Sequence, residues 1–254
     1  MFPDIFKVKD RVALVTGGSK GLGKAMARGL AEAGADVVIS SRHEEELRPA
    51  LDEILKGTDR RGIFVVADMA KRSDVKRLAD TALEKMGRVD ILINNAGTNT
   101  PQPIDQIKDE DWDRVREINL DSVMLLTKAL VPQMKARGWG RIIHISSVMA
   151  LVANPGRNIY CATKAALIGM SRATALDLGS SGITVNCIAP GPFLTDLPAR
   201  LLSAQEKEAF AKMTALNRWA DPKELVGPVL LLASEAGSYI TGETLVVDGG
   251  YVIR

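Results

Sequence analysis

The sequence predicts an α/β protein built on one doubly wound sheet of seven mostly parallel strands, with helices on both faces. Short apolar runs alternate with longer amphipathic stretches along the whole chain. The apolar runs are rich in β-branched residues and nearly continuous, as in strands that are covered on both faces. At 254 residues the chain can bury one sizeable core, and no linker, repeat or low-complexity run divides it. Residues 1–254 are therefore expected to form a single domain.

Seven apolar runs are the expected strands, and each is followed by polar or helical sequence. In chain order they are residues 12–16, 36–40, 63–67, 90–94, 141–145, 183–188 and 244–248.

Helices are expected between these strands. Residues 24–34 form an amphipathic stretch that ends at Gly34, which suits a helix C-terminus. A second helix is expected to begin at Ser73 or Asp74, as N-cap, and to stop at Gly87. Residues 158–178 have a helical pattern throughout.

The composition is that of a soluble globular protein, with 46% hydrophobic and 25% charged residues. A net charge of only +2 gives no support for binding to nucleic acid or to a membrane surface. No window approaches the ~18 apolar residues of a membrane span. The two cysteines form no disulfide framework, and the first residues do not have the pattern of a signal peptide. A cytoplasmic location is therefore expected.

A glycine-rich loop, "TGGSKGLG", follows the first expected strand directly. Gly17, Gly21 and Gly23 have a G-x-x-x-G-x-G spacing, which differs from the G-x-G-x-x-G fingerprint of many dinucleotide sites. The physical purpose is the same: a tight turn, a close backbone approach to phosphate, and the free N–H groups of a helix start. No G-K-[ST] follows, which disfavours an NTPase. Ser19, Lys20 and Leu22 lie in the same loop and are expected to contact the nucleotide.

The end of the second strand indicates which nicotinamide cofactor is used. An NAD site generally has a carboxylate here for the ribose 2′-hydroxyl. This chain has Ser41 and Arg42 instead, with Lys20 on the same side. A hydroxyl and cations suit a 2′-phosphate, so NADP is favoured over NAD. The alternative is that the two cations are only solvated surface residues. Glu44–Glu46 are expected in the first turn of the next helix, where acids complement the helix dipole.

Two further strand ends complete the expected nucleotide site. Asp68, followed by Met69, could accept a hydrogen bond from an adenine amino group, although a turn cap explains it nearly as well. The sequence "NNAG" ends the fourth strand, at the edge where such sheets bind ligands. Asn94 could tie the central strands together, and Ala96 and Gly97 would leave room for a ribose. Asn95 is expected to contact the cofactor with them.

The chemistry is expected where Ser147 ends the fifth strand and Tyr160 and Lys164 follow on a helix. Residues four apart lie on one helix face, so the lysine is expected beside the tyrosine. Free tyrosine has a pKa near 10 and is a poor acid or base at neutral pH. A cation about 4 Å away would lower that pKa by up to about three units. A chance Tyr-x-x-x-Lys is common, but here it follows a nucleotide loop and a strand-end serine.

These residues together resemble the short-chain dehydrogenase/reductase family. The resemblance rests on residues 16–23, on "NNAG", on Asn119 in "REINL", on Ser147, on "YCATK" (160–164) and on "PGPFLT" (190–195). It covers essentially the whole chain and implies one Rossmann-like domain, commonly assembled as a homotetramer.

The resemblance also implies individual roles. Tyr160 would be the acid/base, Lys164 would lower its pKa and bind the nicotinamide ribose, and Ser147 would orient the substrate oxygen. Asn119 would hold a helix irregularity and a water that relays protons. The cofactor would meet Tyr160 and Lys164 again, and further along the chain Pro190, Gly191, Phe193 and Thr195. No metal is expected, because His43 and His144 are isolated and have no metal-ligand spacing.

The predicted activity is hydride transfer between NADP(H) and a small-molecule ketone or secondary alcohol. Substrate choice is expected to lie in residues 148–157 and in a lid formed by residues 193–219. Within the family the sequence is most similar to gluconate 5-dehydrogenases, with 3-oxoacyl-acyl-carrier-protein reductases as the alternative. Arg157, Arg200 or Arg218 could meet a sugar-acid carboxylate. Outside enzymes, the candidates are an NADP-binding sensor or assembly protein and a scaffold that binds no cofactor.

Overall fold

A computed structural model describes residues 2–195 and 203–253 and shows seven parallel strands in one sheet. The strand order is β3-β2-β1-β4-β5-β6-β7, and every adjacent pair is parallel. The predicted fold class is therefore confirmed. The strands are β1 (Val12–Thr16), β2 (Asp36–Ser41), β3 (Gly62–Val66), β4 (Ile91–Asn94), β5 (Gly140–Ile145), β6 (Ile183–Pro190) and β7 (Thr244–Val247).

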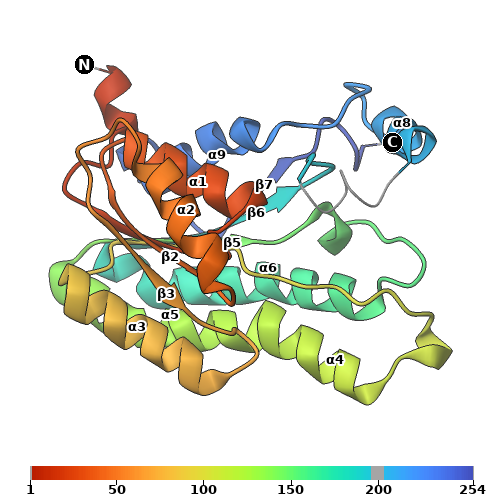
Figure 1. Ribbon diagram of the computed structural model, residues 1–254, viewed down its shortest axis with the longest axis horizontal. Coiled ribbons are helices and arrows are strands. Elements are labelled where there is room, and N and C mark those ends of the chain that lie inside the picture. Colours follow the sequence, from red (N-terminus) through yellow and green to blue (C-terminus); the bar gives the residue numbers. More distant parts are fainter. Residues whose placement is uncertain (1, 196–202, 254) are drawn as a thin grey trace.

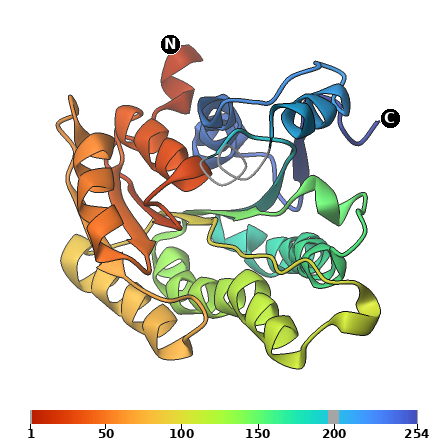
Figure 2. The same ribbon diagram turned by 45° about the vertical axis from the view of Figure 1, so that its right-hand side comes forward.

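Helices cover both faces of this sheet (Figures 1 and 2). One face packs against α1 (Gly21–Glu32), α2 (Glu44–Leu55) and α9 (Val226–Ala233). The opposite face packs against α3 (Arg72–Met86), α5 (Ser122–Arg137) and α6 (Asn158–Leu178). The shorter helix α4 (Asp109–Arg116) continues through one turn into α5 and packs beside α6, and α8 (Ala204–Lys212) lies near the C-terminus (Figure 1).

The core explains why the apolar runs are nearly continuous. Successive strand residues point to opposite faces, so Val15 and Ile93 join the core under α1 and α9. Their neighbours Leu14 and Leu92 join the core above α3 and α5. All four side chains are fully buried. A polar residue at alternate positions would therefore be placed in one of the two cores rather than in water.

The helix boundaries agree with the sequence in most places. The predicted helix at residues 158–178 is confirmed as α6. Gly34 and Gly87 follow α1 and α3 with φ of 105° and 78°, a left-handed conformation that favours glycine. The predicted start of α3 at Ser73 or Asp74 is wrong. Its N-cap is Lys71, because the Asp74 carboxylate is already inside the first turn, where it accepts the Asp68 N–H at 2.9 Å.

The sheet order creates a crevice between β1 and β4. After β1 the chain adds β2 and β3 on one side, and then returns to place β4 on the other side. Loops at the carboxyl ends of these two strands therefore diverge, and open α/β sheets bind ligands at this point. In the part of the chain that the structure describes, no helix has the length and apolar character needed to cross a membrane.

Candidate active site

A cavity of about 290 Å³ opens at the carboxyl ends of β1, β2, β3 and β4. Ten of the residues predicted to bind the nucleotide line it. They are Gly17, Ser19, Lys20, Ser41, Arg42, Asp68, Met69, Asn95, Ala96 and Gly97. Residues that were not predicted to bind the nucleotide also line it, among them Ser40, His43, Glu46 and Thr98. Because β1, β2, β3 and β4 are adjacent parallel strands, the loops at their carboxyl ends surround a single cavity.

The glycine loop is shaped for a close backbone approach. Gly17 and Gly21 have positive φ, of 65° and 53°. A Cβ on Gly23 would lie 2.1 Å from the carbonyl oxygen of Gly17, so only glycine fits there. Helix α1 starts at Gly21 with no side chain capping its first N–H groups. Such groups, at the positive end of the helix dipole, are suited to phosphate oxygens.

Asn95 fastens this loop to the end of β4. Its Nδ2 donates to the carbonyl oxygens of Thr16 at 2.8 Å and of Gly17 at 3.2 Å. Its backbone N–H in turn donates to Thr16 Oγ1 at 3.0 Å. Asn94 links the central strands, as predicted, because its Nδ2 contacts Nδ1 of His144 on β5 at 3.0 Å. Asn95 therefore ties the end of β4 to the loop after β1, and Asn94 ties β4 to β5.

One corner of the cavity carries the charged residues Lys20, Arg42 and Glu46. The contacts of Glu46 there differ from those expected from the sequence. Glu44–Glu46 do occupy the first turn of α2, but Glu46 also points back to the glycine loop. Its carboxylate accepts hydrogen bonds from Lys20 Nζ at 2.9 Å and Ser19 Oγ at 3.0 Å. The bond with Lys20 is the main cause of the lowered pKa of Glu46. Arg42 is exposed and has no side-chain partner among the described residues, which leaves it as the unpaired cation of this corner.

Asp68 performs the turn-capping role that was the alternative to adenine binding. Its Oδ1 accepts the N–H of Ala70 at 3.0 Å. The residue also lines the cavity, so the cap fixes the carboxyl group at the cavity wall. A contact with adenine remains a prediction.

Tyr160 and Lys164 lie one turn apart on α6, as the i, i+4 spacing predicts. Lys164 is 4% exposed, and its Nζ donates to the carbonyl oxygen of Ile145 at 2.8 Å. Burial lowers the pKa of Lys164 to about 8. A Cβ on Gly97 would lie 3.3 Å from this Nζ, so the glycine at the cavity wall leaves space beside the lysine. The lysine is therefore adjacent to the nucleotide cavity.

The predicted effect of Lys164 on the phenol is wrong for this structure. Burial raises the pKa of Tyr160, whereas a hydrogen bond with Ser147 and the charge of Arg157 oppose that rise. Lys164 Nζ lies 5.7 Å from the centre of the tyrosine ring and donates to Ile145, and its charge is not among the causes of the shift in the pKa of Tyr160. The direction of the lysine side chain and the burial of the phenol depend on the folded chain, so the i, i+4 spacing could not predict them.

Ser147 follows β5 and begins a short 3-10 turn, Val148–Ala150. Its side chain is buried and accepts the N–H of Met149 at 3.1 Å. The preceding Ser146 donates to the carbonyl oxygen of Lys164 at 2.8 Å. This bond anchors α6 to the end of β5, and nothing in the sequence beyond the doubled serine indicated it.

Asn119 lies in a π-helical turn, Glu117–Asp121, between α4 and α5, which is the helix irregularity that the family resemblance implied. Its Oδ1 accepts the N–H of Thr98 at 2.8 Å. Its Nδ2 donates to Thr98 O at 2.9 Å and to Thr163 Oγ1 at 3.2 Å. Asn119 thus joins the loop after β4 to α6, next to Lys164.

The segment after β6 reaches the glycine loop, but none of the residues predicted there to contact the cofactor lines the cavity. Pro190 ends β6, and the N–H of Gly191 donates to Val247 of β7 at 2.9 Å. Phe193 is buried in the core, and Thr195 lies against the glycine loop, 3.3 Å from where a Cβ on Gly21 would be. Leu22 packs against the same core as Phe193. Of the expected lid, residues 196–202, including Arg200, lie outside the described residues.

Arg157 and Arg218 were the other candidates to bind a sugar-acid carboxylate, and their surroundings differ. Arg218 forms a surface ion pair with Glu224, at 2.7 Å, and is not free for a substrate. Arg157 is the N-cap of α6, and its charge opposes the rise in the pKa of Tyr160.

His144 is buried against Asn94, and burial lowers its pKa to about 3, so it is neutral. No group of three or more His, Cys, Asp or Glu in the described ranges is arranged to hold a metal ion.

Comparison with known proteins identifies the family. Residues 17–252 match the family described as "Enoyl-(Acyl carrier protein) reductase". The chain is also 36% identical to gluconate 5-dehydrogenase of Gluconobacter oxydans, over 99% of this chain and 98% of that one. It belongs to the short-chain dehydrogenase/reductase family. The predicted resemblance is thereby confirmed, and with it the broad class of oxidoreductase.

Two other members show the range of activities to which this short-chain dehydrogenase/reductase is similar. It is 39% identical to 3-oxoacyl-[acyl-carrier-protein] reductase of Synechocystis, over 96% of this chain and 97% of that one. It is 37% identical to a gluconate 5-dehydrogenase from Burkholderia cenocepacia, whose structure is a complex with NADP and tartrate. That match has a TM-score of 0.91 and covers all of both chains.

Proposed function

We propose that this protein interconverts a ketone and a secondary alcohol with NADP(H), and that its substrate is a sugar acid. The position of Lys164 beside the nucleotide cavity supports this hydride-transfer reaction. Gly97 lines the cavity and also leaves space next to the lysine. The residues fit NADP, since the uncapped start of α1 suits its phosphates and the unpaired Arg42 suits a 2′-phosphate. NAD, which carries no 2′-phosphate, is the less suitable cofactor.

When bound, the nicotinamide would supply or accept the hydride. Tyr160 would donate its phenolic proton to the carbonyl oxygen during reduction and take it back during oxidation. Ser147, which is hydrogen-bonded to Tyr160, would hold the same oxygen. Lys164 has a pKa of about 8, so it can exchange protons with its surroundings near neutral pH and restore the phenol. Asn119 would keep α6 and the loop after β4 in position around them.

Arg157 is the observation that favours a sugar acid. It lies near enough to Tyr160 to oppose the rise in that residue's pKa. No hydrogen bond or ion pair engages its side chain among the residues that the structure describes. A guanidinium with free donors binds a carboxylate in a bidentate manner. A substrate whose ketone meets Tyr160 and whose carboxylate meets Arg157 would satisfy both groups.

The test is a comparison of 5-ketogluconate with an acetoacetyl thioester, under NADPH. Turnover of 5-ketogluconate is expected, and Arg157→Gln should raise its KM about tenfold, since a charge-assisted bond is lost. Arg114→Gln, at an exposed arginine of α4, is the matched control and should leave KM unchanged. Turnover of the thioester alone would instead assign the chain to the 3-oxoacyl-acyl-carrier-protein reductases, which it matches at 39% identity. Binding of NADPH with no carbonyl turnover would favour a sensor.

We also propose a homotetramer that works in the cytoplasm. The edge strand β7 is only half-buried at each of its four residues. On the helices that cover one face of the sheet, Leu176 of α6 is 87% exposed and Met124 of α5 is 41% exposed. Exposed apolar side chains of this kind suit burial between chains. Both cysteines are free thiols, which suits a reducing compartment. Light scattering on the eluting protein should give four chains; a monomer would contradict the proposal.

A further inference from the structure

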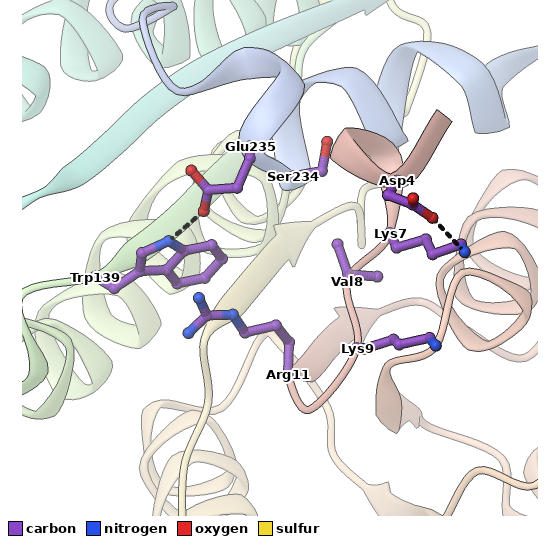
Figure 3. Close-up of a pocket in the computed structure, with 8 residues that line it drawn as sticks. All are labelled: Asp4, Lys7, Val8, Lys9, Arg11, Trp139, Ser234 and Glu235. Carbon is purple, nitrogen blue, oxygen red and sulfur yellow. Dashed lines mark hydrogen bonds and ion pairs between the residues drawn. The ribbon is translucent and has the colours of Figure 1, made fainter. Parts of the chain in front are cut away.

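A second cavity, of about 340 Å³, lies at the amino ends of the strands, whereas the nucleotide cavity lies at their carboxyl ends. Figure 3 shows the residues that line this second cavity. Arg11 immediately precedes β1 and Trp139 immediately precedes β5, so both are at the amino ends of the strands. Ser234 and Glu235, which follow α9, form another wall. The two cavities share no lining residue. This space is therefore not an extension of the proposed active site.

Two guanidinium groups contact the ring of Trp139. The Cζ atoms of Arg11 and Arg141 lie 3.7 Å and 4.3 Å from the centre of its ring. Trp139 Nε1 donates to Glu235 at 2.8 Å, which fixes the plane of the indole (Figure 3). A stacked guanidinium uses its flat face and keeps its N–H donors at the edge. Arg11 is thus held in position while its donors stay available.

The charges around the cavity are only partly neutralised. Glu235 is engaged by Trp139 and lies 3.5 Å from Arg141, and Asp4 pairs with Lys7. Among residues 2–195 and 203–253, no carboxylate forms a direct ion pair with Lys9 or Arg11, although the charge of Lys9 contributes to the lowered pKa values of Asp4 and Asp59.

Arg11 also adds to a local excess of positive charge. The pKa values of Arg137 and Arg141 are lowered, chiefly by burial, and the nearby charge of Arg11 contributes in both cases. An anion at the edge of Arg11 would reduce this repulsion between like charges. Lys9, from the same segment, would add a second positive charge to such a site.

We propose that this cavity is a second binding site, for a compact small molecule that carries at least two phosphate or carboxylate groups. Its volume equals that of about ten water molecules. Two cations without carboxylate partners call for more than one negative charge, and the free edge of Arg11 matches either group in a bidentate manner. Val8, which is buried, gives the cavity an apolar floor that suits the body of a small organic anion.

The experiment is a calorimetric titration of the full chain with inorganic pyrophosphate and, separately, with citrate, at constant ionic strength. One anion per chain is expected to bind saturably. Arg11→Gln should weaken binding at least about tenfold, since a charge-assisted interaction is lost. Arg48→Gln is the matched control, because Arg48 also stacks on an aromatic ring, 5.1 Å from the centre of Phe64, but lies outside the cavity. Lys20→Gln reports on the nucleotide cavity and should leave this binding unchanged.

Saturable binding of pyrophosphate alone would identify a phosphate ligand, and of citrate alone a carboxylate ligand; both support the site. The proposal is overturned if neither anion saturates, if Arg11→Gln has no effect, or if only Lys20→Gln abolishes binding. Should Arg11→Gln fail to fold, Lys9→Gln replaces an exposed side chain and carries the same test, with Lys56→Gln on the exposed end of α2 as its control. Absence of anion binding at this cavity would not affect the proposed oxidoreductase activity, because that activity depends on residues at the carboxyl ends of the strands.

Discussion

Lys20 and Lys164 lie at the two ends of the proposed active site, and their surroundings are opposite in kind. The side chain of Lys20 is 59% exposed and forms an ion pair with Glu46 at 2.9 Å. Lys164 is 4% exposed, has no carboxylate partner among the described residues, and donates to a backbone carbonyl. Water screens the first lysine, so its charge contributes little to stability. Burial of the second lowers its pKa to about 8.

This difference indicates where substitutions will have large effects. At the Lys164 end, the polar groups are buried away from water. Removal of one of them therefore leaves its hydrogen-bond partner unpaired, with no water to replace it. At the Lys20 end, exposed charges can exchange partners with one another and with water. Large effects on catalysis are therefore expected at the buried end, and graded effects on cofactor affinity at the exposed end.

The largest effect is expected for Tyr160→Phe. Loss of the phenolic proton should lower kcat by about 10³-fold, while the affinity for NADPH changes by no more than about twofold. Steady-state kinetics and a fluorescence titration with NADPH measure the two quantities. Tyr239→Phe makes the same chemical change at a fully exposed residue and should have no effect on kcat. Ketone reduction at the wild-type rate in Tyr160→Phe would remove Tyr160 as the acid/base.

The next effect is a dependence of stability on pH that comes from Lys164. Its pKa is about 8 in the folded chain against 10.5 as the ordinary value, so the unfolded chain binds more protons between these pH values. The free energy of unfolding should therefore rise with pH across this window, by about 3 kcal/mol in total. Below pH 8 both states are protonated, and the cost of the buried charge is present in full.

Urea denaturation at pH 7, 8, 9 and 10 measures this dependence. The wild-type protein should gain stability relative to Lys164→Met as the pH rises, because the variant has no amine to deprotonate. Lys56→Met, at an exposed lysine, should follow the wild type. Parallel pH profiles for wild type and Lys164→Met would mean that the buried amine keeps an ordinary pKa. Tyr160 has a raised pKa and acts in the opposite sense, but only above about pH 10.

A smaller effect is expected at Arg42. Arg42→Ala should weaken NADPH binding about tenfold and NADH binding much less, because only NADPH carries a 2′-phosphate for the guanidinium. Fluorescence titrations with both cofactors measure the change. Arg48→Ala, one turn into α2 and outside the cavity, is the matched control. Equal losses for the two cofactors would show that Arg42 does not contact the 2′-phosphate.

The smallest effect is expected for Glu46→Gln. This change frees Lys20 and Ser19 from the carboxylate and removes a negative charge from the expected phosphate position. NADPH should therefore bind about two- to threefold more tightly, a gain typical of an exposed charge. Glu45→Gln, at the neighbouring and more exposed position, should change the affinity less. Weaker binding in Glu46→Gln would indicate that Glu46 positions the loop rather than competing for Lys20.

The sequence was most reliable where local pattern and burial act together. Strand positions, the extent of α6 and the left-handed glycines after α1 and α3 follow from periodicity and from backbone preferences of single residues. The start of α3 was not predictable in this way. The carboxylate of Asp74 could have capped the helix from outside, and only its contact with the Asp68 N–H decides that it lies within the first turn.

For the candidate site, too, local patterns were predictable and long-range contacts were not. The glycine spacing and the Tyr-x-x-x-Lys pair are short-range patterns, so the sequence by itself determined that a phosphate-type loop and a tyrosine–lysine helix face exist. Which partner each side chain takes depends on residues far away in the chain. Glu46 reaches Lys20 across 26 residues, and Lys164 reaches Ile145 across 19.

Desolvation is the quantity that only the tertiary structure decided. A sequence records that Tyr160 and Lys164 are four residues apart, which suggests that the lysine lowers the pKa of the phenol. The folded chain buries both groups and turns the ammonium toward a carbonyl, so burial governs both pKa values. The same holds for the cavity at the amino ends of the strands, where Arg11 and Trp139 meet across 128 residues (139 − 11) only because β1 and β5 share a sheet.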